Sequence, residues 1–266
     1  MTTQMTPEVA AGRLMDMTIA HWTGELLLQA AEMSLADKFT GAQPRSAAEL
    51  AAEYGMRPRE FYRFLRALTG LGLLASAGGG SFRLTDLGAA LRTGAPGAAR
   101  SAVIALIGDM VKPAWKAFDH GLLTGDTGFE KAHGMGLFQY LQTNPGMAHF
   151  FSETMVGFHG REPPAVAEAY DFSGIGSLVD VGGASGNMLG HILSRHPGVN
   201  GVLYDLPHVV ADAPPLLERF GVADRVKIES GSFFDRVPAG HDAYLLSHII
   251  HDWDDDENAT ILGNVR

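Results

Sequence analysis

Short apolar runs alternate with longer stretches of helical periodicity from residue 175 onward. Apolar runs bounded by turn residues are typical of buried strands, and apolar positions three and four apart are typical of helices that cover a sheet. The pattern predicts strands at 177–181, 201–204, 225–229 and 242–247, and helices at 187–195, 208–220 and 255–265. Because strands and helices alternate, we expect an α/β domain with a parallel sheet.

The first hundred residues follow a different pattern, in which helical stretches dominate. Residues 9–38 carry a broad apolar helix face, which we expect to pack against a large surface. A capping-box pattern opens a helix over 47–54, and a proline opens another over 59–71. A glycine-rich turn and a strand-like run at 81–85 follow. Helix, turn, helix and hairpin in this order predict a winged helix.

The middle of the chain begins at a segment of linker character, residues 93–97, which is rich in glycine and proline. Helical periodicity resumes over 101–125 and 136–169, where methionine and phenylalanine are frequent. Most of these side chains are expected in a helix core, although flexible methionines and flat aromatics also suit aromatic ligands. We therefore divide the chain into three segments, 1–98, 99–170 and 171–266.

Composition excludes several classes of protein. The 266 residues include no cysteine, which excludes disulfides, thiolate metal sites and a cysteine nucleophile. No apolar run approaches the ~20 residues of a membrane span, and the first residues lack the pattern of a signal peptide. The net charge of −10 argues against nucleic acid as a main partner. We expect a cytoplasmic protein that acts without a membrane.

The most informative stretch is Leu178-Val-Asp-Val-Gly-Gly-Ala-Ser-Gly186, a predicted strand that runs into a turn of small residues. Such a turn lets backbone N–H groups approach a ligand at a helix N-terminus. Asp205 follows Gly186 by 19 residues, at the end of the next predicted strand, where an acid can hold ribose hydroxyls. A nucleoside-bearing cofactor is favoured over the alternative, a glycine-rich turn without a ligand.

The spacing of the turn disfavours a dinucleotide. The dinucleotide fingerprint Gly-x-Gly-x-x-Gly, counted from Gly182, requires glycine where Ala184 and Asn187 stand. The tighter spacing of Gly182, Ala184 and Gly186 fits the sequence better.

Four ordered motifs resemble those of one enzyme family: VDVGGASG, YDLPHVV, GSFFDRVP and HIIHDWDDDE. Together with FYRFLRALTGLGLL and FRLTDLG upstream, they resemble the S-adenosylmethionine-dependent O-methyltransferases of the plant caffeate and acetylserotonin type, which have many bacterial members. The resemblance implies an α/β Rossmann-like methyltransferase domain after a winged-helix dimerisation domain. It also implies S-adenosylmethionine as cofactor, a small phenolic or polyketide acceptor, and a homodimer formed through the N-terminal domain.

The resemblance assigns roles to individual residues. Gly182 and Gly186 would cradle the methionine part of the cofactor, and Asp205 would bind its ribose. Ser232 and Phe233 would flank the adenine, with Ser247 also at the cofactor. The family usually has an acid at position 232, often Lys or Arg at 247, and most often glycine at 184, so these three positions depart from its pattern.

The resemblance assigns His251 as the general base. A phenol has a pKa near ~10 and imidazole one near ~6.5, so deprotonation should accompany methyl transfer. The alternative is that His251 only forms hydrogen bonds near a helix start. We predict that the acceptor pocket includes Phe151, Met155, His248 and Trp253.

Two possible metal motifs lie beside His251. His248 and His251, three residues apart near a strand end, are expected to point to opposite faces. Asp252, Asp254 and Asp256 resemble the start of a calcium loop, but the glycine and the final acid that such a loop needs are missing. We therefore expect no metal site.

Two other functions remain open from the sequence. Arg59, Arg63 and Arg66 lie on one face of a predicted helix in the winged helix, as in a DNA-binding regulator, although the overall acidity favours a solvated face. Some relatives of the resembled family bind the same cofactor but catalyse hydroxylation or decarboxylation.

The resembled family continues beyond the helix with which this sequence ends, with three more strands and the acids that orient the catalytic histidine. Strand 242–247 is then expected at an uncovered sheet edge. A fragment of a longer protein, a partner chain that supplies the rest, and a cofactor-binding remnant without catalysis are the three explanations, of which we favour the first. We expect the 266 residues alone to have poor or no methyltransferase activity.

Overall fold

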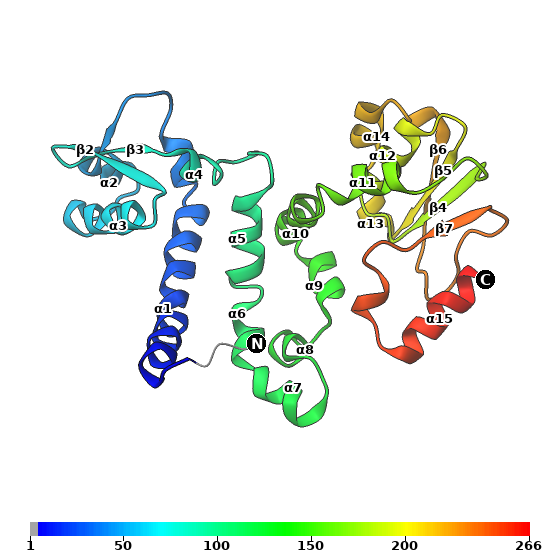
Figure 1. Cartoon of the computed structure of the whole chain (residues 1–266), viewed down its shortest axis with the longest axis horizontal. Helices are drawn as coiled ribbons and strands as arrows, with labels where there is room; N and C mark the ends of the chain where they lie inside the picture. The colour runs from blue at the N-terminus through cyan, green and yellow to red at the C-terminus, as the bar shows by residue number, and fades with distance from the viewer. Residues whose placement is uncertain (1–4) are drawn as a thin grey trace. The chain divides into compact units, whose positions relative to one another are not determined.

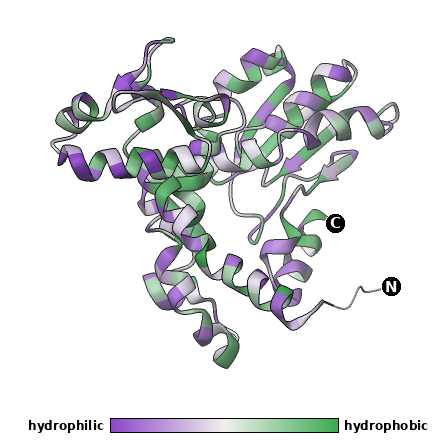
Figure 2. Cartoon of the chain, turned by 60° about the vertical axis from the view of Figure 1, so that its left-hand side comes forward, coloured by the Kyte–Doolittle hydropathy of each residue, from purple (hydrophilic) through white to green (hydrophobic). Residues whose placement is uncertain are grey.

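The computed structural model describes residues 5–266, which divide into two compact units, Met1–Gly157 and Phe158–Arg266 (Figure 1). Helices in both units carry hydrophilic and hydrophobic segments, as expected of helices with one buried face (Figure 2). No helix within the described residues is both long and apolar enough to cross a bilayer. The division into 1–98, 99–170 and 171–266 stays a prediction, and the first four residues of its first segment lie outside the described residues.

The first unit begins with a long helix and continues as a winged helix, as predicted. Its elements are α1 (Pro7–Glu32), η1 (Leu35–Lys38), β1 (Arg45–Ser46), α2 (Ala47–Glu53), α3 (Pro58–Gly70), β2 (Leu74–Gly78), β3 (Ser81–Leu84) and α4 (Asp86–Ala89). The three strands form an antiparallel sheet in the order β1-β3-β2. The capping box is present, because the Ser46 side chain accepts from the Glu49 N–H and the Glu49 side chain accepts from the Ser46 N–H.

Helix α1 is buried only over its second half. Leu28, Ala30 and Ala31 are buried in the unit, whereas Met17 and Trp22 are 71% and 60% exposed. The broad apolar face expected over 9–38 is therefore covered at one end and open at the other. Several large apolar side chains exposed on one helix are typical of a surface that another protein covers.

Residues 101–125 and 136–169 are largely helical, as predicted, but each stretch is divided into several helices. The helices in this part of the chain are α5 (Ala99–Ile107), α6 (Lys112–Lys116), α7 (Phe118–Thr124), α8 (Gly128–His133), α9 (Leu137–Thr143), α10 (Pro145–Phe158) and α11 (Glu162–Ala169). Gly108 is extended after α5, and Asn144 is non-helical before the proline that starts α10. Glycine and proline interrupt the helices although the apolar period continues.

The second unit contains the predicted parallel sheet. Its elements after α11 are β4 (Ser177–Val181), α12 (Asn187–Arg195), β5 (Asn200–Asp205), α13 (Pro207–Val210), α14 (Pro214–Phe220), η2 (Ala223–Arg225), β6 (Val226–Ser230), β7 (Ala243–Leu245), η3 (Ile250–Asp252) and α15 (Asp255–Val265). The strand order is β6-β5-β4-β7, and all three pairings are parallel. The helix expected at 208–220 is two helices, because a second one begins at Pro214.

Strand β7 lies at an edge of this sheet, as predicted, and pairs with β4 among the described residues. It is shorter than the run 242–247, because Leu246 leaves the ladder and Ser247 and His248 form a turn. This turn carries the chain toward the candidate base.

The two faces of the sheet bury alternate residues of its central strands. Leu178 and Leu203 pack in a cluster with residues of α11, α12 and α14. Val179 and Val202 pack on the other face, in a cluster that Val265 of α15 joins. This period of two makes the sheet the middle layer between helices, with α12 on the face toward which position 180 also points.

An acid occupies that position. Asp180 is 1% exposed, and its Oδ2 atom is buried without a hydrogen-bond partner. Burial, together with the negative charge of Asp205, raises the pKa of Asp180 to about 7, although a hydrogen bond from the Leu189 backbone favours the charged form. A buried charge of this kind destabilises the fold unless a ligand or a proton neutralises it.

We predict that Asp180→Asn removes a pH-dependent loss of stability. Between the ordinary pKa of 3.8 and about 7, the native state holds a proton that the unfolded state has released. The free energy of unfolding of the wild type therefore falls as pH rises through that window. Urea unfolding at pH 5 and pH 8 should show the Asn variant gaining about 2–3 kcal/mol relative to the wild type.

The matched control is Asp235→Asn, which changes an exposed acid of the same unit. Its stability relative to the wild type should stay the same at both pH values. An equal shift in both variants would contradict the role of burial at Asp180.

Candidate functional site

The turn after β4 has the backbone of a ligand cradle. Gly182, Ala184 and Gly186 have φ values of 71°, 48° and 81°, and Gly186 is the N-cap of α12. Glycine adopts this left-handed region readily, whereas alanine does so at an energetic cost. The turn therefore leads directly into the positive end of a helix, where an anionic or polar ligand group is stabilised.

The end of β5 fixes this turn. The Gly182 N–H donates to the Tyr204 carbonyl at 2.8 Å, and the Ala184 N–H donates to Asp205 Oδ2 at 2.9 Å. The second bond also explains how alanine is held in a strained conformation at the position where glycine was expected. Asp205 therefore lies beside the turn, as its spacing from Gly186 predicts.

Two positions of the turn have room only for glycine, because neighbouring side chains pack closely against the backbone there. A Cβ atom on Gly182 would lie 2.3 Å from Ile249 Cδ1, and one on Gly183 would lie 2.6 Å from the Asp180 carboxyl. Any side chain at either position would displace these groups, so the backbone itself forms the surface that a ligand meets.

Asp205 keeps acceptor capacity after it has fixed the turn. Its Oδ1 accepts from the Leu206 N–H at 2.6 Å and its Oδ2 from Ala184. Burial raises the pKa of Asp205, while the two backbone hydrogen bonds lower it. Each carboxylate oxygen has two lone pairs, so both atoms can still accept a hydroxyl proton.

Two hydrogen-bonded anchors hold the segment after β6. The Tyr204 hydroxyl donates to the carbonyls of Ser232 at 3.2 Å and Arg236 at 2.7 Å. The Asn264 amide of α15 donates to the carbonyls of Phe233 and Phe234. The Phe233 ring thereby reaches the turn, since a Cβ atom on Gly182 would lie 3.6 Å from its Cε1.

Trp253 belongs to this aromatic group. Its ring meets the rings of Phe233 and Phe234 edge-on, with centroids 5.8 and 4.7 Å apart. The sequence predicts Trp253 in the acceptor pocket, and in the structure it also packs on Phe233, which is expected to flank the adenine. Gly182, Phe233 and Trp253 thus form a continuous apolar wall beside Asp205.

The turn after β7 carries three of the predicted residues. Ser247 is half-buried, and His248 has a left-handed φ of 57°. The His251 side chain is 63% exposed, and its Nε2 lies 3.3 Å from Asp252 Oδ1. Because Ile249 packs against Gly182, this turn is anchored to the same cradle.

The expectation that His248 and His251 point to opposite faces is wrong. Their ring centroids are 5.5 Å apart, because they follow a left-handed turn and a 3₁₀ helix rather than an extended strand. The Nε2 of His248 lies 2.6 Å from Glu162 Oε2.

The remaining two predicted pocket residues lie on α10 in the first unit. Phe151 packs on a cluster that contains Met110 and Leu141, and Met155 is half-buried. Their place in an acceptor pocket with His251 stays a prediction.

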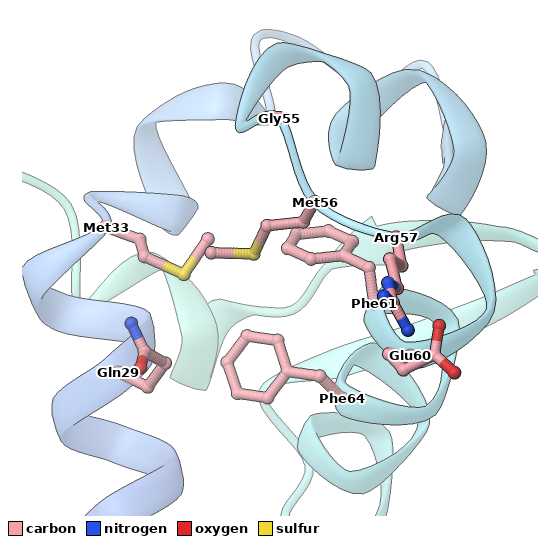
Figure 3. Close-up of a pocket in the computed structure, with 8 residues that line it drawn as sticks. All are labelled: Gln29, Met33, Gly55, Met56, Arg57, Glu60, Phe61 and Phe64. Carbon is pink, nitrogen blue, oxygen red and sulfur yellow. The ribbon is translucent and has the colours of Figure 1, made fainter.

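A cavity of about 410 Å³ lies elsewhere in the first unit, between α1 and the start of α3 (Figure 3). The side chains of Met33 and Met56 point toward one another across it, with the Phe61 ring beside Met56, the Phe64 ring beneath them and Arg57 at its rim. The cavity contains none of the residues predicted to bind cofactor or acceptor.

The residues at the cradle fit an adenosine-bearing cation. Asp180 supplies an orphaned carboxylate oxygen below the turn, and Asp205 supplies acceptors beside it. The apolar wall suits a flat purine, and the two acids favour a ligand with positive charge.

Sequence reasoning missed the contributions of Asp180, Tyr204 and Ile249. An acid inside an otherwise apolar strand was a signal for Asp180, since a buried charge needs a reason. Tyr204 and Ile249 resemble ordinary core residues in the sequence, and only their contacts distinguish them.

Comparison with known proteins agrees with this geometry. The sequence model of the O-methyltransferase domain matches residues 115–266, and that of the O-methyltransferase dimerisation domain matches residues 15–94. The O-demethylpuromycin-O-methyltransferase of Streptomyces alboniger is 40% identical over 97% of this chain and 68% of its own length.

Solved structures give the same result. Mitomycin 7-O-methyltransferase superposes with a TM-score of 0.90 at 30% identity, over 97% of this chain and 76% of its own. An O-methyltransferase from neocarzinostatin biosynthesis, solved with S-adenosylmethionine and 2-hydroxy-5-methyl naphthoic acid, has a TM-score of 0.78 at 30% identity, over 90% and 74%. The cofactor in that structure is the one expected from the sequence. The chain belongs to the O-methyltransferase family.

Proposed function

We propose that this enzyme binds S-adenosylmethionine at the Gly182–Gly186 turn and transfers its methyl group to a hydroxyl of a small aromatic acceptor. The observation that carries the proposal is the turn itself, closed by the bond from the Ala184 N–H to Asp205. Asp205 receives the ribose hydroxyls, and the wall of Phe233 and Trp253 receives the adenine. Gly182 and Gly186 receive the methionine part of the cofactor. Ser232 lies beside the adenine, and Ser247 also contacts the cofactor.

The acceptor class rests on the family and on its named members. Relatives are named as methyltransferases of O-demethylpuromycin, of mitomycin biosynthesis and of 2,7-dihydroxy-5-methyl-1-naphthoate. Such acceptors are small, flat and hydroxylated. A phenolic or polyketide hydroxyl is therefore the acceptor group that we propose for this chain.

When bound, the cofactor supplies an electrophilic methyl group on a sulfonium. The residues of this chain then need to orient the acceptor oxygen and remove its proton. His251 is the proposed base, because it stands past the carboxyl end of β7, on the turn that Ile249 anchors to the cradle. Its exposed ring is open to an acceptor, and Asp252 beside it stabilises an imidazolium once the proton is transferred.

The cofactor proposal predicts selective binding. Titration calorimetry should show binding of S-adenosylmethionine and S-adenosylhomocysteine but not of NAD. In Asp205→Asn, both affinities should fall at least tenfold, because the ribose loses a charged acceptor, worth about 1.5–3 kcal/mol. Asp235→Asn, at an exposed acid, should bind as the wild type does. Preference for NAD would overturn the proposal.

The base proposal predicts a separation of binding from turnover. Relative to the turnover of the wild type, which we expect to be low for these 266 residues, His251→Ala should lower kcat by roughly 10²–10⁴ without changing the affinity for S-adenosylmethionine. Formation of S-adenosylhomocysteine with 2-hydroxy-5-methyl naphthoic acid or another phenol reports turnover. The mass of the product should rise by one CH₂ unit, whereas a hydroxylase or decarboxylase would give another mass. Full activity of the variant would leave His251 with a structural role only.

We also propose a homodimer formed through the N-terminal domain. The open apolar face of α1 lies within the matched dimerisation segment, and the methionine-lined cavity of Figure 3 adjoins the buried end of the same helix. Apolar surface of this extent is stabilised when a second copy covers it.

The dimer proposal predicts that Trp22→Glu weakens self-association, because it puts a charge on the open face of α1. Trp115→Glu is the matched control, since Trp115 is 69% exposed but lies outside the dimerisation segment. Sedimentation velocity should show the first variant dissociating at concentrations where the wild type and the control remain dimers. Equal behaviour of both variants would contradict an interface on α1.

A further inference from the structure

Three side chains of the second unit converge outside the proposed cofactor site. They are His159, Glu162 and His248, and one ligand atom from each lies within 4.8 Å of the other two. His159 Nδ1 lies 3.2 Å from Glu162 Oε1, and His248 Nε2 lies 2.6 Å from Glu162 Oε2. One carboxylate is therefore shared by two imidazoles.

The fold brings these residues together from two distant places in the sequence. His159 follows the end of α10, and Glu162 is the first residue of α11, so the two are neighbours at a spacing of three. His248 arrives from the turn after β7 through its left-handed backbone. A non-glycine residue persists in that conformation only where its surroundings hold it.

The two rings lie close enough together to serve one cation. The ring centroids of His159 and His248 are 3.7 Å apart. A neutral imidazole offers one lone pair on a ring nitrogen, so two such rings can supply two ligands to one ion. The Glu162 carboxylate lies against both histidines and adds an oxygen ligand to the two nitrogens.

Two imidazoles and one carboxylate form a ligand set typical of Zn²⁺. Bonds of about 2.0–2.2 Å to a tetrahedral ion place neighbouring ligand atoms about 3.3 Å apart, close to the 3.2 Å between His159 Nδ1 and Glu162 Oε1. His248 Nε2, now 2.6 Å from Glu162 Oε2, would move slightly away from the carboxylate to bind the same ion. The His159 Nδ1 atom is buried and lacks a hydrogen bond of good geometry, so it can accept a metal at little cost.

We propose that His159, Glu162 and His248 bind one Zn²⁺ ion, with a water molecule in the fourth position. The ion ties α11 to the turn after β7. Its role is structural, because it fixes the turn three residues before His251. This site goes beyond methyl transfer and does not depend on the proposed function.

The test measures metal binding itself. The tag-free chain, treated with a chelator and dialysed, is titrated with Zn²⁺ by calorimetry, and Co²⁺ is used as a second probe with visible absorption. We expect one equivalent of tight binding that a large excess of Mg²⁺ does not displace, since Mg²⁺ prefers oxygen ligands.

The variants separate this site from other histidines. His248→Asn removes the imidazole while asparagine tolerates the left-handed backbone, and Glu162→Gln keeps the size of the side chain. Each should weaken Zn²⁺ binding at least tenfold. His149→Ala is the matched control. His149 forms a similar exposed pair with Glu153, 3.5 Å apart, but is not one of the three clustered residues.

One tight equivalent that the His248 and Glu162 variants weaken would support the zinc site. Absence of a tight equivalent in the wild type, or equal affinity in all variants, would overturn the zinc site and leave an ordinary ion pair. Circular dichroism establishes that each variant is folded. Asp205→Asn should bind Zn²⁺ as the wild type does, so failure of the cofactor proposal can be told apart from failure of this one.

Discussion

The parallel pairing of β4 with β5 is the constraint on which the rest of the second unit depends. Its register sets Val181 opposite Tyr204, so the residues that follow them, Gly182 and Asp205, lie side by side at the carboxyl end of the sheet. The Tyr204 carbonyl then accepts from the Gly182 N–H, and Asp205 accepts from the Ala184 N–H. A slip of one residue would turn Asp205 to the other face and leave the glycine turn without its anchor.

The same pairing creates the electrostatic character of the site. It brings Asp180 and Asp205 into one region of low dielectric, where burial raises the pKa of both acids and the charge of Asp205 raises that of Asp180 further. The buried charge of Asp180 does not improve the stability of the empty fold, whereas Asp205 also anchors the turn. Both are well placed to stabilise a bound group that carries positive charge, which is the charge a sulfonium has. The protein therefore holds unfavourable electrostatic energy that such a ligand would relieve.

The sequence predicted the strands, the winged helix and the place of Asp205 because each depends on local patterns. Alternating apolar runs, capping residues and glycine turns act over a few residues, so they can be recognised in the sequence alone. The order of the motifs then indicated the family. The breaks within α5–α7 and α9–α11 were missed because the apolar period continues across them. The contacts of Tyr204 and Ile249 were missed because they join segments far apart in the sequence. The error on His248 arose from extending a strand beyond Leu245, where the backbone turns left-handed.

The few residues that follow β7 contact several other parts of the second unit. Ile249 packs against Gly182, so the turn after β7 contacts the cofactor cradle. His248 contacts Glu162 at the start of α11. His251 follows on the 3₁₀ helix η3, and Trp253 then packs on Phe233. These contacts on both sides of His251 would suit the proposed base, because proton transfer depends strongly on the distance between base and hydroxyl. The precise placement of one exposed histidine thus depends on apolar and polar contacts that its neighbours make on both sides.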